Sequence, residues 1–263
     1  MMKRFVKSMA PLAVLTLGAG LSGCGNADMT INGEEGVPLS ELDMSGAAPT
    51  ELVVAGSDKV IVTEGDALDV TVEGSDDAVA RMRFILDGDM LGVTREGGSW
   101  DDFGSATVRV TMPAPREIVI AGSGDVEAAT MAPEAEVAIG GSGSMVIANL
   151  GAERFEAALG GSGDIKAAGT TKNLELAIGG SGRADFSELM ADNVEISIGG
   201  SGDVDLMSDG TVEATIAGSG EINVTGDAKC TLNSMGSGTL NCNAATRTAS
   251  SDEASTEQAT AEE

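Results

Sequence analysis

The sequence contains no histidine and no tyrosine, and its only tryptophan is Trp100. Histidine is the commonest general base near neutral pH and the commonest metal ligand in proteins. Aromatic side chains are the surfaces on which single-stranded nucleic acids and sugars stack. This composition therefore argues against histidine-dependent catalysis or metal binding and against stacking sites, and no cofactor is expected.

Basic residues are also scarce, with 15 Lys and Arg against 42 Asp and Glu and a net charge of −27. Residues 1–23 hold three basic and no acidic residues, so the chain without them has 12 basic residues and a net charge of −30. A surface this negative repels phosphate backbones. The charge therefore excludes nucleic acid as an expected partner.

Residues 1–23 have the features of a bacterial lipoprotein signal peptide. Lys3, Arg4 and Lys7 precede the apolar run "APLAVLTLGAGL", which is too short to cross a bilayer as a mature helix. The run ends in "LSGC", which resembles the lipobox at which such signals are cut before the cysteine. The alternative is an ordinary secretory signal with a cysteine at this place by chance.

The lipobox predicts that Cys24 carries a lipid and that residues 24–36 form a tether between this lipid and a folded domain. The membrane would then be a partner through Cys24, and the protein would lie in the cell envelope. Gly25, rather than an aspartate, follows the cysteine, and by resemblance to sorted lipoproteins this favours the outer membrane, on its periplasmic or surface side.

Gly-Ser-Gly recurs through the second half of the chain. Its serines stand at 123, 142, 162, 181, 201, 219 and 237, at spacings of 19, 20, 19, 20, 18 and 18 residues. Three and five residues before each serine, and three and five after it, nearly every position is apolar. The intervening positions are mostly small, polar or charged. This period of two indicates two short strands per repeat, each with one buried face.

One repeat of about 19 residues cannot bury its apolar face alone, so the repeats must stack. We therefore predict an all-β fold, a right-handed parallel β-helix (β-solenoid) with about 19-residue rungs. Residues 37–245 would form the domain, with an irregular β cap at 37–113, in which "SDDAVARMRF" is a helical turn or loop, and seven rungs at 114–245. Residues 246–263 are expected to be a disordered acidic tail. An antiparallel meander closing as a sandwich or barrel is the alternative.

The glycine-rich loops raise the alternative of phosphate binding. A phosphate-binding loop runs from a strand into a helix N-terminus, whereas each loop here leads to another strand. Glycine at a repeated corner is explained by positive φ and by close packing of successive rungs. The structural corners are predicted at Gly122, Gly124, Gly141, Gly143, Gly161, Gly163, Gly180, Gly182, Gly200, Gly202, Gly218, Gly220, Gly236 and Gly238.

Six residues before the serine, a glutamate recurs in six of the seven repeats. We call these residues the glutamate column: Glu117, Glu136, Glu156, Glu175, Glu195 and Glu213. Stacked carboxylates about 4.8 Å apart repel by roughly 0.9 kcal/mol in water, so a solvated column is tolerable. The alternative is that the column collects divalent cations or a basic partner. A calcium β-roll is not predicted, because Ser144 and Arg183 stand where its repeated acid would be needed.

Cys230 and Cys242 fall at inward positions of the last repeat. In an oxidising envelope they could form a disulfide that closes the end of the solenoid. Buried free thiols are the alternative.

The segment "ATVRVTMPAPREIVIAGSGDV", residues 106–126, followed by serial "GGSGD" repeats, resembles the head GIN domain family of autotransporter adhesins, a domain of unknown function. The resemblance covers residues 37–245. It implies a β-helical envelope domain, often lipid-anchored, and it supplies no catalytic residues. The acidic and nearly aromatic-free sequence departs from what carbohydrate binding would need.

Two classes of function follow. The first is a non-enzymatic cell-envelope lipoprotein whose β-helix presents an extended acidic face for adhesion to an envelope protein or matrix polymer. The alternatives are a cation-binding envelope protein and a β-helix enzyme that processes acidic polysaccharides. The charged candidates for the enzyme are Lys166, Arg183, Asp164, Asp185, Asp203 and Asp205.

Overall fold

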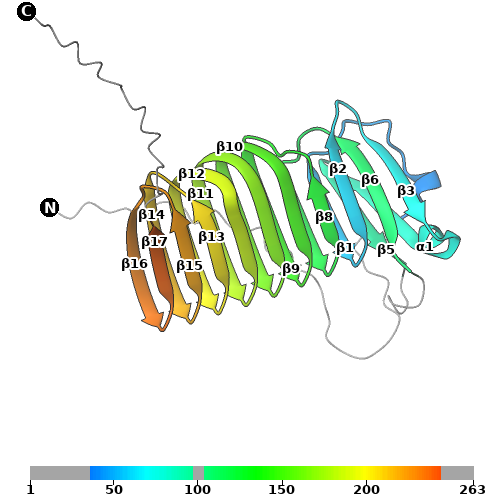
Figure 1. The fold of residues 1–263 in the computed structure, drawn as a ribbon. Helices are drawn as coiled ribbons and strands as arrows, with labels where there is room; N and C mark the ends of the chain where they lie inside the picture. Colours follow the sequence, from blue (N-terminus) through cyan, green and yellow to red (C-terminus); the bar gives the residue numbers. More distant parts are fainter. Residues whose placement is uncertain (1–35, 97–103, 244–263) are drawn as a thin grey trace, which may run out of the picture.

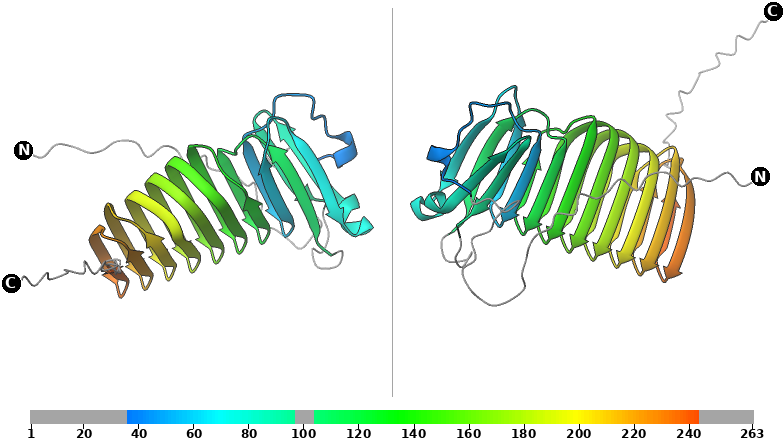
Figure 2. Two further views of the ribbon diagram at one scale, coloured as in Figure 1. Left: turned by 45° about the horizontal axis from the view of Figure 1, so that its top comes forward. Right: turned by 180° about the vertical axis from the view of Figure 1, so that it is seen from behind.

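The computed structural model describes residues 36–96 and 104–243, and this part of the chain is nearly all β-structure (Figures 1 and 2). A short α-helix, α1 (Asp76–Arg81), and a 3-10 helix, η1 (Leu39–Glu41), lie towards its N-terminal end. The strands are β1 (Glu51–Gly56), β2 (Lys59–Glu64), β3 (Asp69–Gly74), β4 (Met82–Asp87), β5 (Met90–Arg95), β6 (Ala106–Met112), β7 (Glu117–Gly122), β8 (Asp125–Ala128), β9 (Glu134–Gly141), β10 (Ser144–Gly161), β11 (Asp164–Gly180), β12 (Arg183–Gly200), β13 (Asp203–Met207), β14 (Thr211–Gly218), β15 (Glu221–Thr225), β16 (Lys229–Gly236) and β17 (Thr239–Asn243).

Successive rungs stack in parallel and in register, as Figure 1 shows. Each rung has a strand on one side, a glycine corner, and a strand on the opposite side. The first face holds β7, β9, β14, β16 and the C-terminal halves of β10, β11 and β12. The second face holds β8, β13, β15, β17 and the N-terminal halves of those three strands. The predicted parallel β-solenoid with rungs of about 19 residues is confirmed, and the antiparallel meander is wrong.

The return from the second face to the first is more regular than the two short strands per repeat imply. β10, β11 and β12 are 18, 17 and 18 residues long and continue from one face to the other without a break. The register shifts at the bend, for example between Ile147 and Leu150. Leu150 and Leu189 point into the interior there and are buried. The bend therefore contributes a third set of buried apolar side chains to the core, beside those of the two faces.

The interior is filled by columns of equivalent apolar side chains. Leu176 is 1% exposed, and its register neighbours Ala157 and Ile196 are also buried. Phe155 and Phe186 meet edge to face in the interior with ring centroids 5.8 Å apart. Burial of such a side chain stabilises the fold by about 1.5–3 kcal/mol, so repetition of the same column supplies most of the stability.

The two glycines of each corner serve different purposes. Gly200 has a φ of 137°, which L-residues rarely adopt. Gly163 lacks a positive φ, but a Cβ atom there would collide with the carbonyl oxygen of Gly143 in the rung before. The serine between the glycines contributes its backbone amide: Ser201 N–H donates to the Gly180 oxygen at 2.8 Å.

The segment before the first predicted rung is less irregular than expected. β1 pairs in parallel with β7, and β2 pairs in parallel with β8, through a corner at Ser57. β5 and β6 form a further layer, parallel to β1 and β2 on their other side. The stacking order therefore differs from the chain order, since the β1–β2 rung lies between the β5–β6 layer and the first Gly-Ser-Gly rung.

Only the outermost layer of the N-terminal end is a cap in the predicted sense. β4 runs antiparallel to β5, and β3 runs antiparallel to β6. Val37 forms a bridge with Phe84 of β4, which occupies part of the remaining edge. The segment predicted as a helical turn or loop contains α1, and the Ser75 side chain caps it by accepting from Ala78 N–H at 3.3 Å.

A buried ion pair joins the β1–β2 rung to the β5–β6 layer. Arg95 of β5 donates to both carboxylate oxygens of Asp58, and Ala106 N–H also donates to Asp58, at 2.8 Å. Asp58 and Arg95 are 3% and 4% exposed. Because a buried charge without a partner is costly, this pair ties the Ser57 corner to the layer above it.

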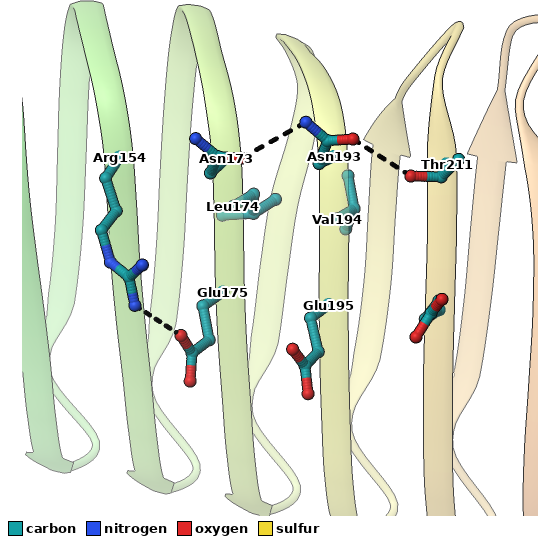
Figure 3. Close-up of a pocket in the computed structure, with 9 residues that line it drawn as sticks. Arg154, Asn173, Leu174, Glu175, Asn193, Val194, Glu195 and Thr211 are labelled. Carbon is teal, nitrogen blue, oxygen red and sulfur yellow. Dashed lines mark hydrogen bonds and ion pairs between the residues drawn. The ribbon is translucent and has the colours of Figure 1, made fainter. Parts of the chain in front are cut away.

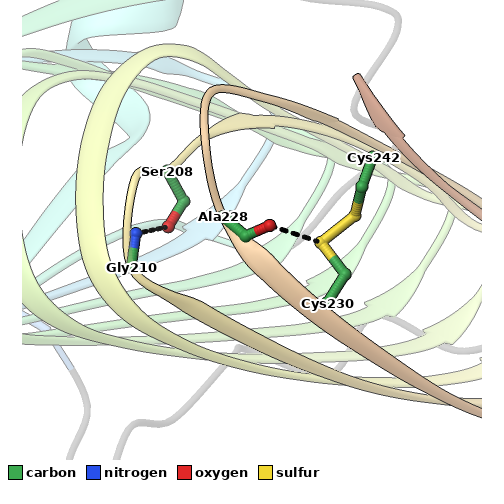
Figure 4. Close-up of a disulfide and its surroundings, with 5 residues drawn as sticks. All are labelled: Ser208, Gly210, Ala228, Cys230 and Cys242. Carbon is green, nitrogen blue, oxygen red and sulfur yellow. Dashed lines mark hydrogen bonds between the residues drawn. A yellow bond between two sulfur atoms is a disulfide. The ribbon is translucent and has the colours of Figure 1, made fainter. Parts of the chain in front are cut away.

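The C-terminal rung is open. β16 pairs only with β14, and β17 only with β15, within the described part of the chain. Leu232 and Met235 are 38% and 74% exposed. Cys230 and Cys242 are joined by a disulfide between β16 and β17, with their Cα atoms 6.7 Å apart (Figure 4).

The predicted signal peptide, the lipid site at Cys24 and the acidic tail at 246–263 lie outside the described residues, as does Trp100. Among the helices at 36–96 and 104–243, none has both the length and the apolar character needed to cross a bilayer.

Candidate interaction face

The structure places all members of the glutamate column side by side on the outside of the first face. Glu136 is in register with Glu117 and Glu156, and Glu195 is in register with Glu175 and Glu213. Sequence reasoning missed a seventh member, because Glu51 of β1 is in register with Glu117. The signal was present in "ELVVAGSD", where Glu51 stands six residues before Ser57.

Two arginines form ion pairs with members of the glutamate column. Arg116 forms an ion pair with Glu51 at the N-terminal end. Arg154 pairs with Glu156 of its own strand and reaches Glu175 of the next rung at 2.9 Å. The hydrogen bond to Glu156 raises the pKa of Arg154 above its usual value.

The N-terminal part of the column is crowded enough to shift proton binding. Partial burial, followed by the neighbouring Glu136 and Glu51 carboxylates, raises the pKa of Glu117, and Arg116 opposes this. Partial burial and the Glu156 carboxylate likewise raise the pKa of Glu136. Lost hydration and like charge both disfavour the ionised form.

The C-terminal part of the column borders a shallow hollow of about 290 Å³ (Figure 3). Its lining residues are Arg154, Asn173, Leu174, Glu175, Asn193, Val194, Glu195, Thr211 and Glu213. On one side, Asn193 Nδ2–H donates to Asn173 Oδ1 at 3.3 Å, and Thr211 Oγ1–H donates to Asn193 Oδ1 at 3.2 Å. Neither Glu195 nor Glu213 takes part in an ion pair with any residue at 36–96 or 104–243.

Next to the column, the first face carries a strip of very small side chains. We call it the smooth strip: Ala138, Ala158, Ala177, Gly140, Gly160, Gly179 and Gly199. These glycines lack positive φ. A Cβ atom at Gly160 or Gly199 would come no closer than 3.7 or 3.9 Å to any other group. The fold therefore has room for larger side chains, unlike at the corners, and glycine there leaves the outer face flat.

The smooth strip meets a small apolar cluster at the N-terminal end. Val53, Ile85, Met90 and Val119 lie on the outer side of the first face and are all buried, and Ala138 packs against them. The sequence repeat does not reveal this cluster, because it unites strands from the cap with β7. The flat, open part of the face begins beyond it, over β10, β11 and β12.

Metal and phosphate sites find little support. In the described ranges, no three His, Cys, Asp or Glu side chains are grouped closely enough to hold a metal ion. The corner amides are already used, since Ser201 N–H donates to Gly180 O and Asp203 N–H donates to Gly182 O at 3.2 Å. A bound phosphate would have to displace these hydrogen bonds between rungs.

The charged residues considered for catalysis gather on the second face. Lys166 lies 3.3 Å from Asp185, and Arg183 lies 3.4 Å from Asp203. A hydrogen bond from Ser187 lowers the pKa of Asp185, which is the wrong direction for a general acid at neutral pH. None of these residues lines the hollow described above or a second, smaller hollow of about 120 Å³ beside Glu117 and Glu136, and both hollows lie on the first face.

Comparison with solved structures gives the same fold. The chain is 22% identical to a "putative adhesin" from Bacteroides fragilis NCTC 9343, with a TM-score of 0.69, covering 74% of this chain and 92% of that chain. It is 19% identical to a "putative lipid binding protein" from Parabacteroides distasonis ATCC 8503, with a TM-score of 0.60, covering 74% and 93%. It is 17% identical to a "putative adhesin" from Parabacteroides merdae ATCC 43184, with a TM-score of 0.60, covering 74% and 92%.

No match was found among curated proteins. A family model described as "Putative auto-transporter adhesin, head GIN domain" matches residues 48–228. That range runs from β1 to the start of the last rung and includes both outer layers of the N-terminal end. The resemblance seen in the sequence is thereby confirmed, and the chain belongs to this head GIN domain family.

Proposed function

We propose that this protein is a non-enzymatic lipoprotein of the cell envelope that adheres to a partner through the first face of its solenoid. The observation that carries the proposal is the pairing of the glutamate column with the smooth strip. Glycines with room for a side chain leave a flat surface beside a line of carboxylates. A flat, acidic face suits a partner that is itself extended and carries positive charge.

The family and its adhesin-named structural relatives agree with a binding role rather than with catalysis. The second face carries the ion pairs Lys166–Asp185 and Arg183–Asp203, and such surface pairs are expected on any solvated sheet. The lipid on Cys24 would hold the domain at the membrane, in the outer membrane if the "LSGCG" sequence acts as a sorting signal. The partner would be a basic segment of an envelope protein or a matrix polymer with cationic groups.

Site-specific crosslinking in intact cells tests the proposal. A photo-crosslinking residue at Ala177, on the smooth strip, should capture a partner, whereas the same residue at Asp205, on the second face, should not. Equal capture at both positions, or capture only at Asp205, would contradict the proposal.

Charge reversal sharpens the test. Glu195→Lys with Glu213→Lys should weaken capture at Ala177, because these two carboxylates lack an ion-pair partner in the described chain. Asp164→Lys with Asp205→Lys is the matched control, since it makes the same change of charge on the second face and breaks no ion pair in the described chain. If the control lost capture and the first variant did not, the binding surface would lie on the second face, which would contradict the proposal.

A further inference from the structure

The last rung differs from the others in charge. Residues 229–243, "KCTLNSMGSGTLNCN", contain no aspartate or glutamate in a chain with a net charge of −27. Each of the six preceding rungs carries at least two acidic residues on its strands. Thr231 stands in register with Glu213 and ends the glutamate column, and Thr239 stands in register with Glu221.

The same rung is the one left open. β16 and β17 have strand neighbours on one side only within the described chain, so each presents an edge to solvent. Leu232 lies in the inward column, yet it is 38% exposed, and Leu240 is only partly buried. An unprotected strand edge with apolar side chains beside it is a template for pairing with another chain.

We propose that this end binds the same end of a second copy. A two-fold axis perpendicular to the solenoid axis would set β16 antiparallel to the partner's β16 and β17 antiparallel to the partner's β17. Both faces would then continue across the interface. The N-terminal end shows that this solenoid accepts such a junction, because β3 and β4 pair there antiparallel to the strands of a parallel rung.

Charge explains why the pairing is confined to this rung. With a strand spacing of about 4.8 Å, Glu213 of one copy would lie at least about 14 Å from the equivalent residue of the other, because three strand spacings separate the two β14 strands. That separation exceeds the Debye length of about 8 Å at physiological salt. Acidic side chains on β16 itself would instead lie on the strand that meets the partner's β16, well within the range over which like charges repel.

Other occupants fit the end less well. Residues 244–263 contain five acidic residues and no apolar side chain larger than alanine, so they offer nothing to cover Leu232. The N-terminal end of another copy is already covered, since Val37 bridges to β4 at its edge. An end-to-end dimer is closed, which avoids a filament.

Sedimentation velocity of the processed chain, residues 24–263 with Cys24→Ser to exclude the lipid, tests the proposal. The pairing strands hold only eight and five residues per copy. We therefore expect a weak dimer, which should form progressively as the protein concentration is raised from about 1 to 500 μM. X-ray scattering of the dimer should give about twice the monomer's maximum dimension. A monomer at all concentrations, or a dimer no longer than the monomer, would overturn the proposal.

A matched pair of variants locates the interface. Asn233 and Thr215 are register neighbours on the outside of the first face, and both are exposed. Asn233→Glu should weaken dimerisation at least tenfold at low salt, with partial recovery at high salt, whereas Thr215→Glu should change it less than twofold. Equal effects of the two variants would refute the end-to-end contact. So would a dimer that forms only after residues 246–263 are removed, because the tail would then be the occupant.

Discussion

At the N-terminal end of the solenoid, β3 and β4 run antiparallel to a parallel rung, and a buried ion pair joins that rung to the next. At the C-terminal end, β16 and β17 have no such cover in the described chain, and a disulfide joins them instead. A stacked array can thus be ended by added strands or by a covalent link across the last rung. Added strands pair with the edge of the terminal rung, whereas a covalent link leaves that edge free to pair with another strand.

The largest expected effect is at the N-terminal end. Asp58→Ala leaves Arg95 buried without its counter-ion and removes the acceptor for Ala106 N–H. We expect a loss of about 3–5 kcal/mol in the free energy of unfolding. Urea denaturation measures it, and Glu73→Ala, which breaks an exposed pair with Arg109, is the control and should cost less than about 1 kcal/mol. A small loss for Asp58→Ala would show that the pair does not hold this end together.

At the C-terminal end, Cys230→Ser with Cys242→Ser removes the disulfide. Because this bond closes a short loop, the chain-entropy model predicts a loss of about 2–3 kcal/mol in the free energy of unfolding. Because each rung contacts only its neighbours, the loss should be local. Hydrogen exchange should speed up in β16 and β17 and remain unchanged in β1 and β7. Intact mass with and without reductant checks that the bond is present in the unaltered protein, where reduction should add two daltons.

Replacing a corner glycine with alanine should destabilise the protein more in the middle of the solenoid than in the last rung. Gly200→Ala forces a side chain into a φ of 137° and against Gly180, with rungs on both sides. We expect a cost of about 1–3 kcal/mol. Gly236→Ala makes the same change in the last rung, where one side is open, and should cost less. Thermal unfolding of the two variants measures the difference, and equal losses would mean that the last rung is as constrained as the middle.

The smallest effect concerns pH on the first face. Glu117 and Glu136 bind protons more tightly in the folded chain than at the ordinary pKa of 4.5. Their contribution to stability is therefore complete below pH 4.5 and is lost as pH rises through the raised values. The melting temperature should rise slightly as pH falls from 7 towards 5. Glu117→Gln with Glu136→Gln should flatten this rise, whereas Glu195→Gln with Glu213→Gln should flatten it less.

Sequence reasoning recovered the regular part of the solenoid because each rung repeats the same local pattern. Inward columns, corners and the glutamate column all follow from alignment on one serine, and the structure places them in register. It failed at the N-terminal end because β1 and β2 are inserted between the β5–β6 layer and the β7–β8 rung, which follow each other in the chain. The Asp58–Arg95 pair spans 37 residues, and no repeat predicts it.

The candidate face divides in the same way. The carboxylates could be predicted from the repeat, but the arginines that neutralise part of the column could not. Arg154 occupies a position held by Asn173 and Asn193 in the next rungs, so its ion pairs depend on side-chain reach across rungs. The flatness of the smooth strip also required the structure, because a glycine in the sequence does not show whether a side chain would fit.

The sequence by itself determined the rung, since an alternation of apolar and polar residues at a period of about 19 has one way to bury its apolar half, which is to stack. Only the tertiary structure decided how the stack begins and ends. An end has no repeat to follow, and its strand edges must be satisfied by whatever segment, bond or partner can reach them. For that reason, the antiparallel strands over one end and the open edge at the other become visible only in the folded chain.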